Sequence, residues 1–189
     1  MLPNTPDPVA VTLDPSTTAF LVLDLTTATC SNRPVCVAQL PGLADFLAKA
    51  RAAGVAVIYS NTPGSTVLPE VAPAGNEPLV TSSADKFFNT NLDDLLKDRG
   101  IETKIIVGTA SNGAALYTPF GANERGYTVV VADDGISQFE PYQVQLSRWQ
   151  LLNQPGFANA DNTPLKTRAV TLSRTDLITF ETMAPGEAM

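Results

Sequence analysis

Residues 104–134 constrain the fold most, because they have the pattern of a strand, a Gly-rich turn, a helix and a second strand with short connections. The apolar run at 105–107 is followed by Gly108, and residues 127–132 repeat the apolar pattern. Continuous apolar runs are typical of strands buried on both faces, and two such strands joined through a helix pair in parallel by a right-handed crossover. The turn 108–114 is therefore expected at the carboxyl end of a central strand, where open α/β sheets bind ligands.

The rest of the chain also alternates between strand and helix patterns. Strands are expected at 18–25, 55–60 and 169–172, and helices at 37–53, 92–96 and 141–152, with 175–180 as a tail segment. Gly54 and Gly100 stand where helix C-caps are common. Alternation of this kind predicts an α/β layer architecture.

The length and composition fit one domain spanning residues 1–189. The chain has 189 residues and 44% hydrophobic content, which is enough to bury one core. Prolines at 3, 6, 8 and 15 disfavour helix, so residues 1–16 are expected to form an extended N-terminal arm. Arms of this kind often pack along a neighbouring subunit.

The charge balance argues against two classes of partner. There are 12 basic and 19 acidic residues, giving a net charge of −7, which disfavours binding to nucleic acid and to anionic membranes. No apolar run approaches the ~20 residues of a membrane span, and the first residues lack the pattern of a secretory signal, so a cytoplasmic protein acting on a small molecule is expected.

Two charged residues stand where chemistry is expected. Asp24 closes the apolar strand at 18–25, and burying an unpaired carboxylate is costly, so it needs a partner. Lys86 precedes Phe87, which suggests that the ammonium group enters apolar surroundings. Taken alone, Asp24 could instead make a capping contact, and Lys86 could be a solvated lysine beside Asp85.

Together, Asp24, Lys86 and the turn 108–114 resemble the isochorismatase-like hydrolase superfamily, from about residue 17 to 134. The resemblance implies a three-layer α/β/α fold with a six-stranded, mostly parallel sheet of Rossmann-like topology. It also implies a catalytic triad of Asp, Lys and Cys. Asp24 and Lys86 match the first two positions, whereas Ala114 occupies the position of the cysteine nucleophile.

Three explanations of Ala114 remain open. The chain could act like the isochorismatases proper, which resemble this family, lack the cysteine and activate water. It could be an amide hydrolase whose cysteine at position 114 has been replaced by alanine, or a catalytically inactive relative that only binds a small molecule. On the first reading, Asp24 is a general acid/base, Lys86 is its charged partner, and the space beside Ala114 and Asp24 is wide enough for a water molecule.

The resemblance also implies how the pocket is built. Thr109–Ala110 falls where family members have a cis peptide bond, and the backbone amides of Gly113 and Ala114 are expected to form an oxyanion hole. Thr26 replaces a usual Gln near the pocket mouth. Substrate-binding residues are therefore expected among Thr109, Ala110, Gly113, Thr26 and Phe87. Burial should raise the pKa of Asp24, and the charge of Lys86 should lower it, which suits proton transfer near neutral pH.

The absence of histidine limits the chemistry. A Ser-His-Asp triad is excluded, and so is the histidine-bearing metal site that nicotinamidases of this family use. No metal and no cofactor are therefore expected. The expected partners are a small-molecule substrate and further copies of the chain in a dimer or tetramer.

The remaining expectations concern flexible or reactive segments. Residues 61–83 are rich in Pro, Gly, Ser and Thr and are expected to form a lid, although an insertion without function is the alternative. Cys30 and Cys36 could form a disulfide, but free thiols are favoured in a cytosolic protein, and Cys30 could even be a relocated nucleophile. Pro119 is expected to distort its helix, and Trp149 is expected in the core.

Overall fold

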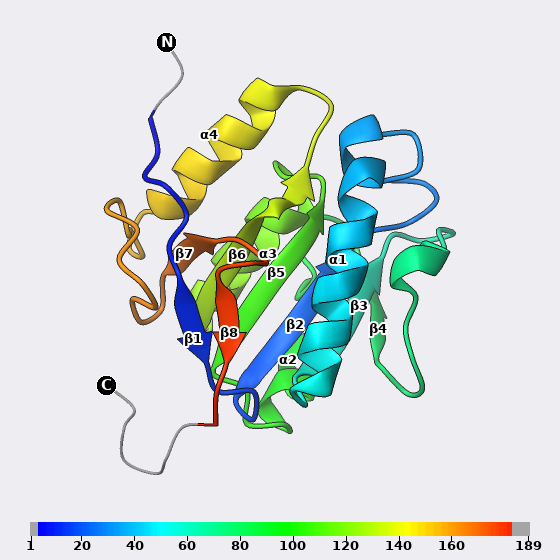
Figure 1. Cartoon of the computed structure of the whole chain (residues 1–189), viewed down its shortest axis with the longest axis horizontal. Helices are drawn as coiled ribbons and strands as arrows, with labels where there is room; N and C mark the ends of the chain where they lie inside the picture. The colour runs from blue at the N-terminus through cyan, green and yellow to red at the C-terminus, as the bar shows by residue number, and fades with distance from the viewer. Residues whose placement is uncertain (1–3, 183–189) are drawn as a thin grey trace.

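The structure is a computed structural model that describes residues 4–182. Its main sheet has six strands in the order β4-β3-β2-β5-β6-β7, and all neighbouring strands are parallel (Figure 1). The strands are β2 (Thr18–Leu23), β3 (Ala56–Asn61), β4 (Leu79–Thr81), β5 (Thr103–Thr109), β6 (Thr128–Ser137) and β7 (Val170–Ser173). The order reverses between β2 and β5, and such a switch point at the carboxyl ends of the strands is where ligands bind in open α/β sheets.

Helices cover both faces of this sheet, so the expected three-layer α/β/α fold is confirmed. The helical elements are α1 (Pro34–Ala52), the short 3₁₀ helix η1 (Pro69–Val71), α2 (Leu92–Lys97), α3 (Ala114–Glu124) and α4 (Pro141–Leu152). In Figure 1, α1 lies in front of the sheet, whereas α2 and α3 lie behind it. The apolar residues of α2, α3 and the end of α4 share one core cluster, and those of α1 belong to another.

The local sequence explains the elements nearest the switch point. All six residues of β2 are buried, as its continuous apolar run predicts. Helix α1 begins with Pro34, which suits the first helical position, and buries an apolar stripe at helical spacing. The stripe comprises Leu40, Leu43, Phe46, Leu47 and Ala50.

Gly108 sets the distance between β2 and β5 at their carboxyl ends. Its φ is +136°, and a Cβ at this position would lie 1.9 Å from the carbonyl oxygen of Leu23. Any larger residue would push the two strands apart where Leu23 pairs with Gly108, so glycine is required here. This close approach brings Asp24, which follows β2, next to the turn that follows β5.

The N-terminal arm packs on its own chain. Strand β1 (Val11–Leu13) pairs in parallel with β8 (Ile178–Phe180), forming a separate two-stranded sheet. The amide of Val9 also donates to the carbonyl of Leu172 (3.0 Å). The described part of the arm therefore lies along the C-terminal strands rather than reaching outward, and residues 178–180 form a strand where only a tail segment was expected.

Residues 61–83 are more regular than expected, because they contain η1 and the edge strand β4. The segment is fixed to the body by an antiparallel bridge between Thr26 and Val67, by a hydrogen bond from the Leu68 amide to the Leu25 carbonyl (2.9 Å), and by burial of Val71. It thus covers the loop that follows Asp24. Opening of this segment as a lid stays a prediction.

Trp149 is 38% exposed, so its predicted place in the core is wrong; α4 buries Ser147, Leu151 and Leu152 instead. Helix α3 runs without a break through the buried Pro119. In the described part of the chain, no helix is long and apolar enough to cross a membrane.

Candidate active site

The structure brings Asp24 and Lys86 together at the switch point. The Lys86 Nζ lies 2.7 Å from Asp24 Oδ2, and the Ser60 hydroxyl donates to Asp24 Oδ1 (2.8 Å). The lysine is fully buried and Asp24 is 4% exposed. A buried charge pair of this kind must be well hydrogen-bonded to offset the loss of hydration.

The surrounding backbone supplies the remaining hydrogen bonds. Asp24 has a positive φ of 52°, which turns the chain out of the strand, and its amide donates to the Ser60 carbonyl (3.2 Å). The Lys86 ammonium also donates to the carbonyls of Ser82 (3.2 Å) and Ser83 (2.6 Å). With Asp24, these carbonyls give the ammonium three acceptors, which fixes its position.

Burial dominates the pKa of Asp24. Desolvation raises the pKa of this carboxyl above its ordinary value, while the hydrogen bond and charge of Lys86 and the hydrogen bond from Ser60 oppose the rise without cancelling it. Both opposing effects were expected from the sequence, and their balance is set by the depth of burial. A carboxylate whose pKa is raised is a stronger base than an ordinary aspartate, so it takes a proton from water more readily.

The turn after β5 has the expected backbone form at its start. The peptide bond between Thr109 and Ala110 is cis. The Gly113 amide, however, donates to the Ala110 carbonyl (2.9 Å) within the turn, so it is not free to bind a substrate oxygen. The amide of Ala114, the first residue of α3, has no intrahelical acceptor by its position. The expected pair of amide donors is thus reduced to one.

Three expected pocket residues make contacts within the protein, and their part in substrate binding stays a prediction. Ala114 is 3% exposed and belongs to the core cluster under α3. Phe87 stacks against Tyr127, with ring centroids 6.4 Å apart. The Thr26 hydroxyl is hydrogen-bonded to that of Thr29 (2.8 Å) and is buried.

Two surface pockets of the structure lie away from Asp24. The structure has surface pockets of about 230 Å³ and 320 Å³, and neither is lined by Asp24, Lys86 or Ala114. The space for a water molecule that was expected beside Ala114 and Asp24 is therefore not part of either pocket. Low exposure of both Asp24 and Ala114 agrees with a closed site.

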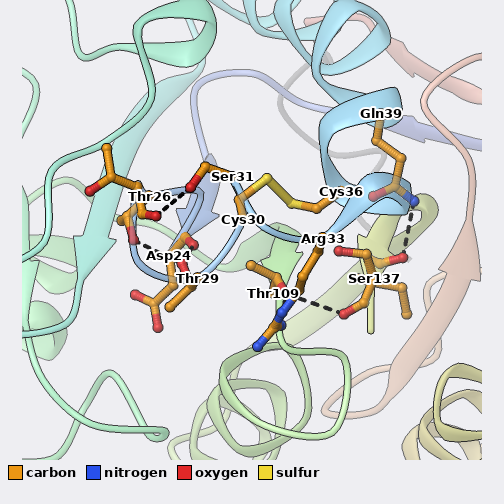
Figure 2. The surroundings of a disulfide bond; sticks show 12 residues. Asp24, Thr26, Thr29, Cys30, Ser31, Arg33, Cys36, Gln39, Thr109 and Ser137 are labelled. Carbon is orange, nitrogen blue, oxygen red and sulfur yellow. Dashed lines mark hydrogen bonds between the residues drawn. A yellow bond between two sulfur atoms is a disulfide. The ribbon is translucent and has the colours of Figure 1, made fainter. Parts of the chain in front are cut away.

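The expectation of free thiols is wrong. Cys30 and Cys36 form a disulfide with their Cα atoms 5.4 Å apart (Figure 2). Cys36 lies in the first turn of α1 and Cys30 in the turn before this helix, so the start of the helix brings the two side chains together. In this state Cys30 cannot act as a relocated nucleophile.

Arg33, between the two cysteines, was missed by the sequence reasoning. Its Nη1 donates a hydrogen bond to the Thr109 hydroxyl, and its guanidinium lies over the Phe139 ring at 4.6 Å from the centroid. Figure 2 shows Arg33 extending from the disulfide-closed loop toward Thr109. The available signal was a basic residue centred between two cysteines just after a strand that ends in an acid.

Metal ligands are not grouped in the described residues. Within 4–182, no cluster of three or more His, Cys, Asp or Glu side chains is placed to hold a metal ion. The candidate site thus consists of the Asp24–Lys86 pair, the turn from Thr109 to Ala114, and Arg33.

Several solved structures have the same fold. A cysteine hydrolase from Pseudomonas syringae pv. phaseolicola 1448A is 20% identical, with a TM-score of 0.75, and the match covers 90% of this chain and 94% of that chain. N-carbamoylsarcosine amidase from Thermoplasma acidophilum is 19% identical (TM-score 0.69; 85% and 97% covered). The nicotinamidase from Staphylococcus aureus is 18% identical (TM-score 0.68; 77% and 98% covered).

At these identities the structural similarity shows the fold alone, and no curated protein sequence matches the chain significantly. The family is shown by the sequence itself, since residues 18–159 match the isochorismatase domain. This range includes Asp24, Lys86, the disulfide and the turn that follows β5. The chain therefore belongs to the isochorismatase domain family.

Proposed function

We propose that this protein is a hydrolase acting on a small polar molecule, with Asp24 as the general acid/base and Lys86 as its charged partner. The observation that carries the proposal is the buried Asp24–Lys86 pair, 2.7 Å apart, at the switch point of the sheet. Perturbed, buried and paired groups at such a place are typical of active sites. The family and the structural neighbours, which include a cysteine hydrolase and an amidase, support the same reaction class.

The proposed chemistry uses water rather than a thiol, because Ala114 offers only a methyl group. Asp24 takes a proton from the attacking water and returns it to the leaving group, so no net proton is consumed by the enzyme. Lys86 stabilises the negative charge of the Asp24 carboxylate before the first of these steps and after the second. The Ala114 amide, at the N-terminus of α3, would stabilise negative charge on the substrate.

The test is turnover in wild-type protein and in Asp24→Asn. A panel of isochorismate, nicotinamide, N-carbamoyl amides and lactones is assayed with both proteins, and Asp176→Asn serves as the control because that aspartate lies on the surface near the C-terminus. Loss of a general acid/base is expected to lower kcat by roughly 10²–10⁴-fold. Turnover that survives Asp24→Asn would contradict the mechanism.

A second candidate function is binding without turnover. The closed surroundings of Ala114 and the low exposure of Asp24 favour it, since an enzyme of this type needs room for water beside the carboxylate. On this proposal the panel yields no products with wild-type protein, while calorimetry detects saturable binding of one of its members. Product formation that depends on Asp24 would exclude this candidate.

A further inference from the structure

Arg33 carries a charge that no carboxylate in the described part of the chain neutralises. The ion pairs found between residues 4 and 182 do not include it, in contrast to Lys86, which pairs with Asp24. Its Nε is buried without a hydrogen-bond partner, and its Nη1 donates to the neutral hydroxyl of Thr109. Most of the five N–H donors of this guanidinium therefore have no protein acceptor.

The position of Arg33 places this charge close to Asp24. Leu23 of β2 pairs with Gly108 of β5, so the next residues, Asp24 and Thr109, lie side by side at the carboxyl ends of these strands. Adjacent strands are about 4.8 Å apart, so a group bound to Thr109 is within the length of a small molecule from Asp24. In Figure 2 the Asp24 carboxylate and the Arg33 guanidinium point to the same side of the sheet edge.

Two contacts and a closed loop hold the guanidinium in one place. The Phe139 ring lies against its face, and the Thr109 hydroxyl accepts a hydrogen bond from one nitrogen. The disulfide closes the loop around Arg33, which is three residues from each cysteine. Phe139 is 54% exposed, so a small molecule can reach this pair. A fixed, uncompensated guanidinium beside an aromatic ring is suited to bind a planar anion, because little side-chain entropy is lost when the anion binds.

We propose that Arg33 is a specificity-determining residue that binds a carboxylate group of the substrate, and that the disulfide between Cys30 and Cys36 positions it. The Asp24–Lys86 pair is neutral as a unit, so Arg33 gives the site a net charge of one positive unit, which matches a monoanion. This inference rests on the proposed function in that it assigns a substrate class to the same site. Binding measurements test the role of Arg33, whereas turnover measurements test the proposed hydrolysis.

The experiment compares benzoate with its neutral analogue benzamide by titration calorimetry. Wild-type protein is expected to bind benzoate more tightly, and Arg33→Met should weaken benzoate binding roughly 10- to 100-fold, the usual cost of losing a hydrogen bond to a charged group, while benzamide changes less than about twofold. Arg33→Lys should retain part of the preference because it keeps the charge. Arg99→Met, which changes an exposed arginine on another element, should behave as wild type.

Positioning by the disulfide is tested with the Cys30→Ser/Cys36→Ser double variant. Benzoate binding should weaken while benzamide binding stays unchanged, and thermal unfolding checks that each variant is folded. The Asp24→Asn variant should keep the benzoate preference, so failure of the proposed hydrolysis is distinguishable from failure of this inference. Equal binding of benzoate and benzamide by the wild type, or a preference that persists in Arg33→Met, would overturn it.

Discussion

Residue 114 decides which nucleophile this site can use. The methyl group of Ala114 is buried at the start of α3, where a thiol would benefit from the helix N-terminus, but the neighbouring Gly113 amide is already bound within the turn. A cysteine at this position would therefore lack one of the two amide donors that a tetrahedral intermediate needs. Geometry around a nucleophile must be correct to within about 0.5 Å for efficient catalysis.

We predict that Ala114→Cys creates a reactive thiol but not an efficient amidase. The new thiol is titrated with iodoacetamide across pH, and nicotinamide and N-carbamoyl amides are assayed in parallel. Alkylation by iodoacetamide reports on position 114 alone, because both native cysteines are in the disulfide and residues 4–182 contain no free cysteine. Robust amide hydrolysis by the variant would show that the site is intact, and would favour the explanation that an amide hydrolase has lost its cysteine by substitution.

The loop between β2 and α1 is the element in which the structure departs most from expectation. Its disulfide joins residues separated by six positions, and closing a loop of this length restricts the unfolded chain by about 2 kcal/mol. The start of α1 and the position of Arg33 both depend on this loop.

We predict that unfolded wild-type protein contains no free thiol unless a reductant is added, and that the Cys30→Ser/Cys36→Ser variant loses about 2 kcal/mol of unfolding free energy. Thiol titration with Ellman's reagent in denaturant measures the first quantity, and urea unfolding measures the second. Two titratable thiols without reductant would contradict the disulfide. Such a bond is uncommon in reducing compartments, so the same titration on protein from cells also tests the predicted cytoplasmic location.

The elements that could be predicted are those with long, continuous patterns. Continuous apolar runs predict the strands β2 and β5, and apolar residues at helical spacing predict α1. Together these patterns predict the central layers and the position of Asp24. Strands β1, β4 and β8 have three residues each, which is too short for a period to be visible. Their pairing depends on contacts between distant parts of the chain.

The same distinction applies to the candidate site. Asp24 and Lys86 could be named because they stand where the resemblance places the Asp and Lys of the triad, and Asp24 also closes an apolar run. Thr26 and Phe87 were placed by their position near these residues, but sequence does not reveal where a side chain points: Thr26 is hydrogen-bonded to Thr29, and Phe87 stacks on Tyr127. Arg33 lies within a loop whose shape is set by a disulfide, so its contact with Thr109 could not be derived from spacing.

At the scale of the whole molecule, the surface bears on assembly. Tyr142, Leu146 and Trp149 are each more than a third exposed and follow one another at helical spacing on α4, beside the exposed Phe139. Exposed apolar side chains grouped in this way are typical of interaction surfaces. The expected dimer or tetramer stays a prediction, and this part of α4 is the surface on which it would first be examined.

The stability of the whole molecule should depend on Lys104, at the amino end of β5 and far from the candidate site. Its ammonium is fully buried over the Tyr127 ring, 2.5 Å from the centroid, without a hydrogen-bond partner in the described residues. Burial lowers the pKa of Lys104 to about 6, with the charge of Asp93 opposing the shift. The folded protein thus holds this lysine neutral at pH 8, whereas the unfolded chain holds it protonated.

Because the unfolded state then binds more protons than the folded state, the free energy of unfolding should rise with pH between about 6 and 10, by at most about 1.4 kcal/mol per pH unit from this group. Above this window the effect reverses, since burial raises the pKa of Tyr59 and Tyr127. Urea unfolding from pH 6 to 9 measures the slope.

Lys104→Met should be more stable than wild type at pH 7 and should lose most of the slope, because it removes the group that must give up its proton on folding. Lys166→Met, at an exposed lysine, should keep the wild-type slope, and equal slopes in all three proteins would show that Lys104 folds in its charged form.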